Sequence, residues 1–148
     1  MKFEFATAGR IVFGTGSIKD AAACAHDLGS HALVVTGKNP DRAQVLLDSL
    51  KQAGVSWTLF SVAGEPSIHQ VEEGGHLGRQ FSADVVIGFG GGSAIDAAKA
   101  IAALMRNTQN ILDYLEVVGR GMPLTQKPVP CIAIPTTADW RTLTFTSL

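Results

Sequence analysis

The sequence lacks a surplus of charge of either sign. Its 148 residues carry 12 Lys and Arg against 13 Asp and Glu, a formal net charge of −1, and no basic run or basic helix face stands out. Nucleic acids and anionic membranes are bound through clustered positive charge, so we expect neither as a partner. The amino terminus has no signal-peptide core, and no later run approaches ~18 continuous apolar residues. These absences favour a cytoplasmic protein.

Cysteine is scarce as well, which argues against a disulfide framework. Cys24 and Cys131 are the two cysteines, and they lie far apart without CxxC spacing. Cys24 falls in an alanine-rich helical pattern and Cys131 in an apolar strand pattern. We therefore predict two buried thiols, a pattern compatible with a reducing cytoplasm.

The four histidines do not form a metal-ligand pattern. His69 and His76 are seven residues apart on one predicted helix, roughly 10 Å along its axis at ~1.5 Å per residue, which is too far for them to share one ion. His26 and His31 lie on either side of a helix end, where we expect them at the surface. The sequence predicts no metal site and no catalytic residue in this chain.

Hydrophobic residues make up 46% of the chain and charged residues 17%, as in a globular domain, and strand-like and helix-like patterns alternate along it. Strands are predicted at 10–13, 32–35, 55–60, 83–89 and, as the last element, 129–134. Helices are predicted from 18 to 28, from 40 to 50, from 68 onward, from 93 to 105 and around 111–115. Parallel strands need crossover connections, so this alternation predicts a Rossmann-like, doubly wound α/β fold with a largely parallel sheet and helices on both faces.

The helix predicted from 68 onward carries Gly74, Gly75 and Gly78. Each glycine costs about 1 kcal/mol relative to alanine inside a helix, so we expect this helix to be weakened.

The most informative feature is a glycine turn that joins the predicted strand 83–89 to the helix that follows. It comprises Gly90, Gly91, Gly92 and Ser93. Glycine lets a ligand approach the backbone closely, and the first helical turn offers unpaired amide N–H groups together with the positive end of the helix dipole. This arrangement predicts a diphosphate site at the carboxyl edge of the sheet.

Other interpretations of the glycine turn remain open. Ser93 and Asp96 could form a capping box at a turn that binds nothing. The turn is not a Walker loop, because Gly-Lys-Ser/Thr is missing, and it is not the GxGxxG fingerprint of a first strand. The separate Gly14-Thr15-Gly16 segment is interpreted as a simple turn.

Four segments are informative in combination: 10–16 (RIVFGTG), 34–38 (VVTGK), 84–99 (with GGGSxxDxAK) and 134–138 (IPTTA). Together they resemble the iron-containing (group III) alcohol dehydrogenase family, a relative of glycerol dehydrogenase and dehydroquinate synthase. The resemblance implies that the GGGS turn holds the pyrophosphate of NAD or NADP and that Asp96 lies near the nicotinamide end. It also implies that Thr136 and Thr137 lie near the adenosine or its ribose, although threonines after a strand often only satisfy local backbone groups.

The residues after the predicted strand 32–35 bear on the choice of cofactor. NAD-preferring relatives often carry an acidic residue there, whereas this chain has Gly37, Lys38 and Asn39. The missing carboxylate removes repulsion against a 2′-phosphate, and Lys38 adds attraction, so the segment favours NADP over NAD. The alternative is an ordinary turn before a helix.

The resemblance stops after Ala138, where the family continues with Gly-Thr-Gly-Ser-Glu and an all-helical second domain. We therefore divide the chain into a dinucleotide-binding domain, 1–138, and a non-family tail, 139–148, which a shifted reading frame, a misassigned gene end or a foreign tail would explain. The family's metal ligands, an aspartate and three histidines, belong to the second domain, so Fe(II) or another divalent metal is not expected to bind this chain.

The resemblance implies the cofactor-binding part of a metal-dependent NAD(P) alcohol dehydrogenase acting on a small alcohol or aldehyde, inactive as this isolated chain. It is also compatible with a homodimer of the full-length enzyme. Two alternatives remain open. One is a stand-alone nucleotide-binding module without catalysis. The other is part of a glycerol-dehydrogenase-like or dehydroquinate-synthase-like enzyme.

Overall fold

The computed structural model describes residues 10–13, 18–114, 119–136 and 142–146. Six strands form one sheet in the order β1-β6-β5-β4-β2-β3. Strands β5, β4, β2 and β3 are mutually parallel, and β6 and β1 extend this sheet in antiparallel fashion. The strands are β1 Arg10–Phe13, β2 His31–Thr36, β3 Ser56–Ser61, β4 Val85–Gly90, β5 Cys131–Pro135 and β6 Thr142–Thr146.

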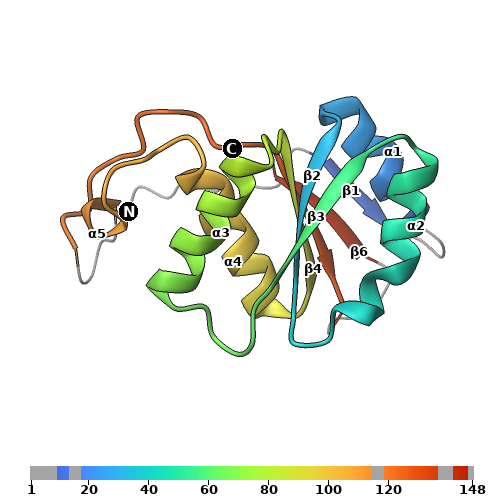
Figure 1. The fold of residues 1–148 in the computed structure, drawn as a ribbon, viewed down its shortest axis with the longest axis horizontal. Coiled ribbons are helices and arrows are strands. Elements are labelled where there is room, and N and C mark those ends of the chain that lie inside the picture. Colours follow the sequence, from blue (N-terminus) through green and yellow to red (C-terminus); the bar gives the residue numbers. More distant parts are fainter. Residues whose placement is uncertain (1–9, 14–17, 115–118, 137–141, 147–148) are drawn as a thin grey trace, which may run out of the picture.

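Helices cover both faces of this sheet, as Figure 1 shows. One hydrophobic cluster packs α1 and α2 against one face, and a second packs α3 and α4 against the other. The helices are α1 Ile18–Leu28, the short 3₁₀ turn η1 Pro40–Ala43, α2 Gln44–Gln52, α3 Ile68–Gln80, α4 Gly92–Leu104 and α5 Ile111–Tyr114. The predicted Rossmann-like, largely parallel α/β fold is confirmed. No helix in the described part of the chain is long and apolar enough to cross a membrane.

The expectation that 129–134 is the last strand was wrong. Strand β6, Thr142–Thr146, follows it and lies between β5 and β1, with Phe145 in register with both Ile132 and Arg10. Alternating threonine and large apolar residues suit a strand. The segment 139–148, which we predict to be a non-family tail, therefore contributes a strand to the sheet.

The helix α3 continues through its glycines, which let it lie close to α4. The side chain of Ile101 occupies the space that a Cβ on Gly74 would need, and Met105 Sδ lies 2.7 Å from the Cβ position of Gly78. Gly74 and Gly78 are buried in this contact. Close helix packing compensates for the intrinsic helix propensity that glycine lacks.

Gly88 of β4 makes a similar contact with α4. A Cβ built there lies 2.8 Å from Ala98 Cβ and 3.2 Å from Ile95 Cα, neither of which can rotate away. Gly88→Ala should therefore lower the free energy of unfolding by about 1–3 kcal/mol through overpacking. Gly92→Ala is the control, since nothing lies within 4 Å of its Cβ position. Urea unfolding of both variants measures the difference, and equal stabilities would contradict this account of Gly88.

The two cysteines are buried, as the sequence predicted, and they lie on opposite faces of the sheet. Cys24 belongs to the α1–α2 cluster and Cys131 to the α3–α4 cluster. Burial raises the pKa of the Cys131 thiol to about 12, against a smaller opposing effect of Lys99. The thiol of Cys131 is therefore protonated at neutral pH.

Candidate functional site

Three segments that are distant in sequence meet at the carboxyl edge of the parallel strands. Gly37 follows β2, the glycine turn follows β4, and Thr136 follows β5. The Thr136 amide donates a 2.8 Å hydrogen bond to Gly90 O. Gly90 has φ +150°, and the Cβ position at Gly90 lies 3.4 Å from Gly37 N, so a side chain there would crowd the Gly37 backbone. Glycine at position 90 therefore permits the close approach of the two loops.

The meeting point of β2 and β4 is a topological switch point. The strands are neighbours in the sheet, but the chain leaves β2 for α2 on one face and leaves β4 for α4 on the other. Loops that diverge in this way open a crevice above the strand ends, where open α/β sheets bind ligands. The predicted glycine turn thus lies at the edge of the sheet where the sequence placed it (Figure 1).

The amino end of α4 has no side-chain cap. Its N-cap residue is Gly91, and the interpretation of Ser93 and Asp96 as a capping box is wrong. The helix begins at Gly92, one residue earlier than expected, which places Ser93 inside the first turn, where it cannot act as N-cap. By contrast, α3 begins with a complete capping box between Ser67 and Gln70.

The space in front of this helix end is open. Nothing lies within 4 Å of the Cβ positions of Gly92 and Gly37. Gly92, Ser93 and Asp96 are exposed. The first amides of α4 lack intrahelical acceptors, and they carry the positive end of the dipole. Amides of this kind can donate hydrogen bonds to a diphosphate, and apart from chain neighbours no described side chain lies within 4 Å of the Gly37 and Gly92 Cβ positions.

Of the residues after β2, Asn39 stabilises the local fold, whereas Lys38 lies at the surface. Asn39 Oδ1 accepts a 3.2 Å hydrogen bond from the Asp41 amide and caps η1, so its oxygen has a structural role. Lys38 is exposed and makes no ion pair with any residue that the structure describes. Of the two threonines predicted at the site, Thr136 lies next to Gly90. Thr137 and the whole Gly14-Thr15-Gly16 segment fall outside the described residues.

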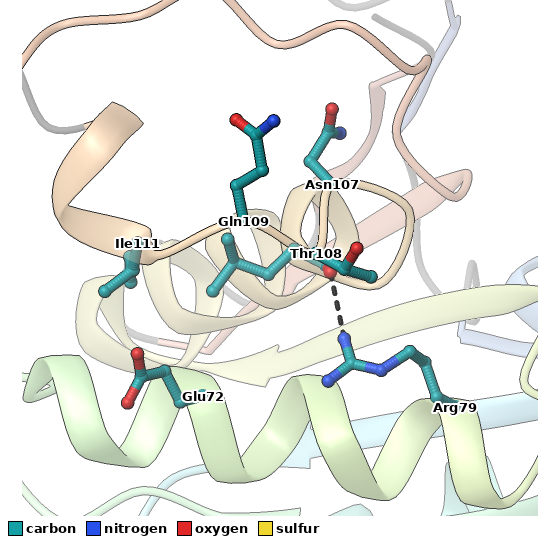
Figure 2. Close-up of a pocket in the computed structure, with 7 residues that line it drawn as sticks. Glu72, Arg79, Asn107, Thr108, Gln109 and Ile111 are labelled. Atoms are coloured by element: carbon teal, nitrogen blue, oxygen red, sulfur yellow. Dashed lines mark hydrogen bonds between the residues drawn. The ribbon is translucent and has the colours of Figure 1, made fainter.

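At the carboxyl end of α4, the last carbonyl groups of the helix accept hydrogen bonds from other segments. A cavity of about 200 Å³ lies there, between α3 and the segment that follows α4. In Figure 2, Arg79 reaches across from α3, and its Nη1 donates a 3.0 Å hydrogen bond to Leu104 O. The Val129 amide donates to Ala102 O at 3.1 Å. The polar groups of this cavity thus satisfy the last carbonyls of the helix, and we interpret the cavity as structural.

Asn107 also hydrogen-bonds the carboxyl end of α4. This residue was not identified from the sequence. Its side chain is 2% exposed. Its Nδ2 donates to Ala103 O and Gln126 O, both at 2.9 Å, while its Oδ1 accepts from the amides of Thr125 at 3.0 Å and Gln126 at 2.9 Å. One amide side chain thereby fixes the 119–128 loop to the end of α4. No sequence signal marks it, because its partners in the loop, Thr125 and Gln126, are 18 and 19 residues away.

Asp84 links the amino ends of β2 and β4, at the edge opposite the glycine turn. It accepts hydrogen bonds from the backbone amides of Ser30 and His31, both at 2.9 Å. Burial by itself raises the pKa of this carboxyl, but these amides and the nearby His31 ring lower it more, and the net shift is downward. The sequence placed Asp84 in the family motif but gave no role for it.

The lowered pKa makes the contribution of Asp84 to stability depend on pH. The unfolded carboxyl titrates near 3.8. The stabilisation is therefore complete above that pH and is lost as the pH falls through the lower folded-state pKa. We expect Asp84→Asn to unfold more easily at pH 7 and to lose less stability than the wild type between pH 5 and 2. Asp27→Asn, on the exposed side of α1, is the charge-matched control, and chemical denaturation across this range is the measurement. An acid dependence unchanged in Asp84→Asn would contradict this.

Among the described residues, no group of three or more His, Cys, Asp or Glu side chains is placed to hold a metal ion.

Comparisons with known proteins agree with this geometry. A family model described as iron-containing alcohol dehydrogenase matches residues 8–139. Sulfoacetaldehyde reductase of Bilophila wadsworthia is 39% identical over 93% of the chain and 36% of its own length. Choline dehydrogenase of Bacillus subtilis is 36% identical over 92% of the chain and 34% of its own length. The chain thus spans about a third of the length of these curated relatives.

Solved structures show the same fold. Sulfoacetaldehyde reductase from Bifidobacterium kashiwanohense, in complex with NAD⁺, superposes with a TM-score of 0.79 at 32% identity, covering 93% of this chain and 37% of that one. A 1,3-propanediol oxidoreductase, 20% identical, shares the fold with a TM-score of 0.80 over 99% of this chain and 43% of that one. The family model covers most of the residues, and they fold as the corresponding part of these enzymes does. The chain belongs to the iron-containing alcohol dehydrogenase family.

Proposed function

We propose that this chain is the cofactor-binding part of a metal-dependent NAD(P) alcohol dehydrogenase, and that the glycine turn holds the diphosphate of the cofactor. The observation that carries the proposal is the amino end of α4, which lies at the switch point, has no side-chain cap and opens into free space. A diphosphate would accept hydrogen bonds from the first amides of α4 and lie at the positive end of its dipole. Such contacts need no basic side chain.

The remaining predicted residues have roles on either side of the diphosphate. Ser93 is exposed in the first turn, and its hydroxyl donates a hydrogen bond to a phosphate oxygen. Asp96, one turn further, lies toward the nicotinamide. Gly90, Gly91 and Gly92 keep the approach clear. When bound, the nicotinamide would accept or deliver the hydride of an alcohol–aldehyde conversion.

The adenosine half of the cofactor lies on the side of β2. Gly37 leaves room beside the ribose, and the exposed Lys38 supplies positive charge for a 2′-phosphate, while Asn39 caps η1 and so holds this turn in place. We also propose that Thr136 and Thr137 contact the adenosine or its ribose. The absence of a carboxylate after β2 supports NADP over NAD. The relative from Bifidobacterium kashiwanohense was solved with NAD⁺, so the choice needs a direct test.

Catalysis requires more than this chain supplies. In the whole enzyme a divalent metal would supply Lewis-acid chemistry at the alcohol or aldehyde oxygen, and we infer that its ligands belong to the helical domain. We therefore propose that the chain by itself oxidises no alcohol and reduces no aldehyde, with or without added Fe(II).

Calorimetric titration with NADP⁺, NAD⁺ and inorganic pyrophosphate tests the proposal. We expect saturable binding of all three, with NADP⁺ tighter than NAD⁺. A folded chain that binds none of them would end the cofactor assignment, and turnover of an alcohol would end the proposal of inactivity. Tighter binding of NAD⁺ would refute only the NADP preference.

A stand-alone nucleotide-binding module is the second candidate. It is favoured by the sheet itself, because helices cover both of its faces within the described residues. A monomeric chain that binds the dinucleotide and unfolds cooperatively would support it, whereas aggregation through an exposed apolar face would not.

A further inference from the structure

We infer that the Ser61 hydroxyl donates a hydrogen bond to the 2′ substituent of the adenosine ribose and that Thr36 positions the Ser61 side chain. This inference rests on the proposed function, because it assigns a further contact to the same crevice. Ser61 lies outside the family segments, and Thr36 lies in the 34–38 segment (VVTGK) but has no predicted role there. The two residues come from different strands.

The two hydroxyls form a pair at the carboxyl edge of the sheet. Thr36 is the last residue of β2 and Ser61 the last of β3, and the two are in register. Thr36 Oγ1 and Ser61 Oγ lie 3.0 Å apart. The Val62 amide donates to Thr36 O at 2.8 Å, so the backbone holds the two strand ends together.

Burial differs between Thr36 and Ser61, and this difference indicates which hydroxyl donates the hydrogen bond. Thr36 is 0% exposed, whereas Ser61 is exposed. In the described part of the chain, the Thr36 hydroxyl has Ser61 Oγ as its hydrogen-bond partner. Either hydroxyl could donate, but a buried hydroxyl proton needs an acceptor and the exposed Ser61 can donate to solvent, which favours Thr36 as the donor and Ser61 as the acceptor. The proton of Ser61 is then free to point outward, and accepting a hydrogen bond strengthens Ser61 as a donor.

The position of this free donor matches the ribose end of a dinucleotide. Thr36 directly precedes Gly37, whose backbone approaches Gly90 in the crevice. A cofactor whose diphosphate lies on α4 extends its adenosine over the end of β2, and the end of β3 lies one strand further out. There Ser61 can donate to a 2′-phosphate or a 2′-hydroxyl, beside the charge of Lys38. A serine hydroxyl can donate a hydrogen bond to either substituent. An acidic side chain would bind only the 2′-hydroxyl, because it repels a 2′-phosphate.

Binding of 2′,5′-ADP, 5′-AMP and inorganic pyrophosphate separates these contacts. We expect Ser61→Ala to bind 2′,5′-ADP about tenfold more weakly, the size of one hydrogen bond to a charged acceptor, with pyrophosphate binding unchanged. Ser61→Asp should reverse the preference and bind 5′-AMP more tightly than 2′,5′-ADP. Ser56→Ala, at the other end of β3, is the matched control and should change neither affinity.

Thr36→Val tests the positioning step, because valine keeps the shape of threonine and removes the donor. It should weaken 2′,5′-ADP binding without affecting pyrophosphate. Its effect should not add to that of Ser61→Ala in the double variant, since both act through one contact.

The possible outcomes distinguish this inference from the proposed function. If the wild type binds pyrophosphate but Ser61→Ala binds 2′,5′-ADP as the wild type does, the role of Ser61 is refuted and the diphosphate site stands. Equal weakening of all three ligands by Ser61→Ala would also refute it, because that result indicates general damage to the crevice. If the wild type binds none of the three, the proposed function fails and this inference fails with it.

Discussion

Gly92→Asp should abolish diphosphate binding while leaving the fold at least as stable as the wild type. Gly92 is the first residue of α4, and nothing lies within 4 Å of its Cβ position, so the side chain fits. A carboxylate in the first turn interacts favourably with the helix dipole, by about 0.3–1 kcal/mol. The same carboxylate lies where the phosphates would bind, and repulsion between like charges at this range weakens binding by about 100-fold or more.

Gly92→Asn is the matched control, because asparagine has nearly the volume of aspartate without its charge. Calorimetric titration with pyrophosphate and NADP⁺ gives the affinities, and thermal unfolding gives the stability. We expect the asparagine variant to lose far less affinity than the aspartate variant. If Gly92→Asp binds pyrophosphate as tightly as the wild type, the diphosphate does not lie at the amino end of α4. If both variants unfold early, the open space at Gly92 has been misjudged.

Asn107→Asp should be the most destabilising of the variants considered, at about 3 kcal/mol. The substitution keeps the acceptor for the Thr125 and Gln126 amides but removes both N–H groups that serve Ala103 O and Gln126 O. A buried carboxylate then faces two carbonyl oxygens that have lost their donor, and each unsatisfied buried group costs roughly 1–3 kcal/mol. Urea unfolding at pH 7 measures the loss.

Asn110→Asp is the control for this prediction. Asn110 is exposed, and its Oδ1 accepts a 2.9 Å hydrogen bond from the Leu112 amide at the start of α5, which a carboxylate accepts equally well. We expect Asn110→Asp to leave stability within about 0.5 kcal/mol of the wild type, as surface substitutions usually do. If Asn107→Asp is as stable as Asn110→Asp, the 119–128 loop does not depend on the amide of Asn107.

Contacts between groups far apart in the chain were beyond sequence reasoning. Asp84 meets the amides of Ser30 and His31 more than 50 residues away. Such contacts arise only when crossover connections bring strand ends together, and no local periodicity encodes them. The alternative interpretation of Ser93 and Asp96 as a capping box depended on the residue at which the helix begins. In a run of glycines the sequence does not mark that residue, and the structure has Gly91 as the N-cap.

The sequence by itself determined the alternation of strands and helices, the glycine turn between β4 and α4, and the resemblance that names the family. These features are local, because hydrophobic period and the backbone freedom of glycine act within a few residues. Only the tertiary structure decided that β6 completes the sheet, that Gly37 approaches Gly90, and that Thr36 holds Ser61. Strand order and loop approach depend on which faces pack together, so the crevice exists only once β2 and β4 lie side by side and their helices diverge to opposite faces.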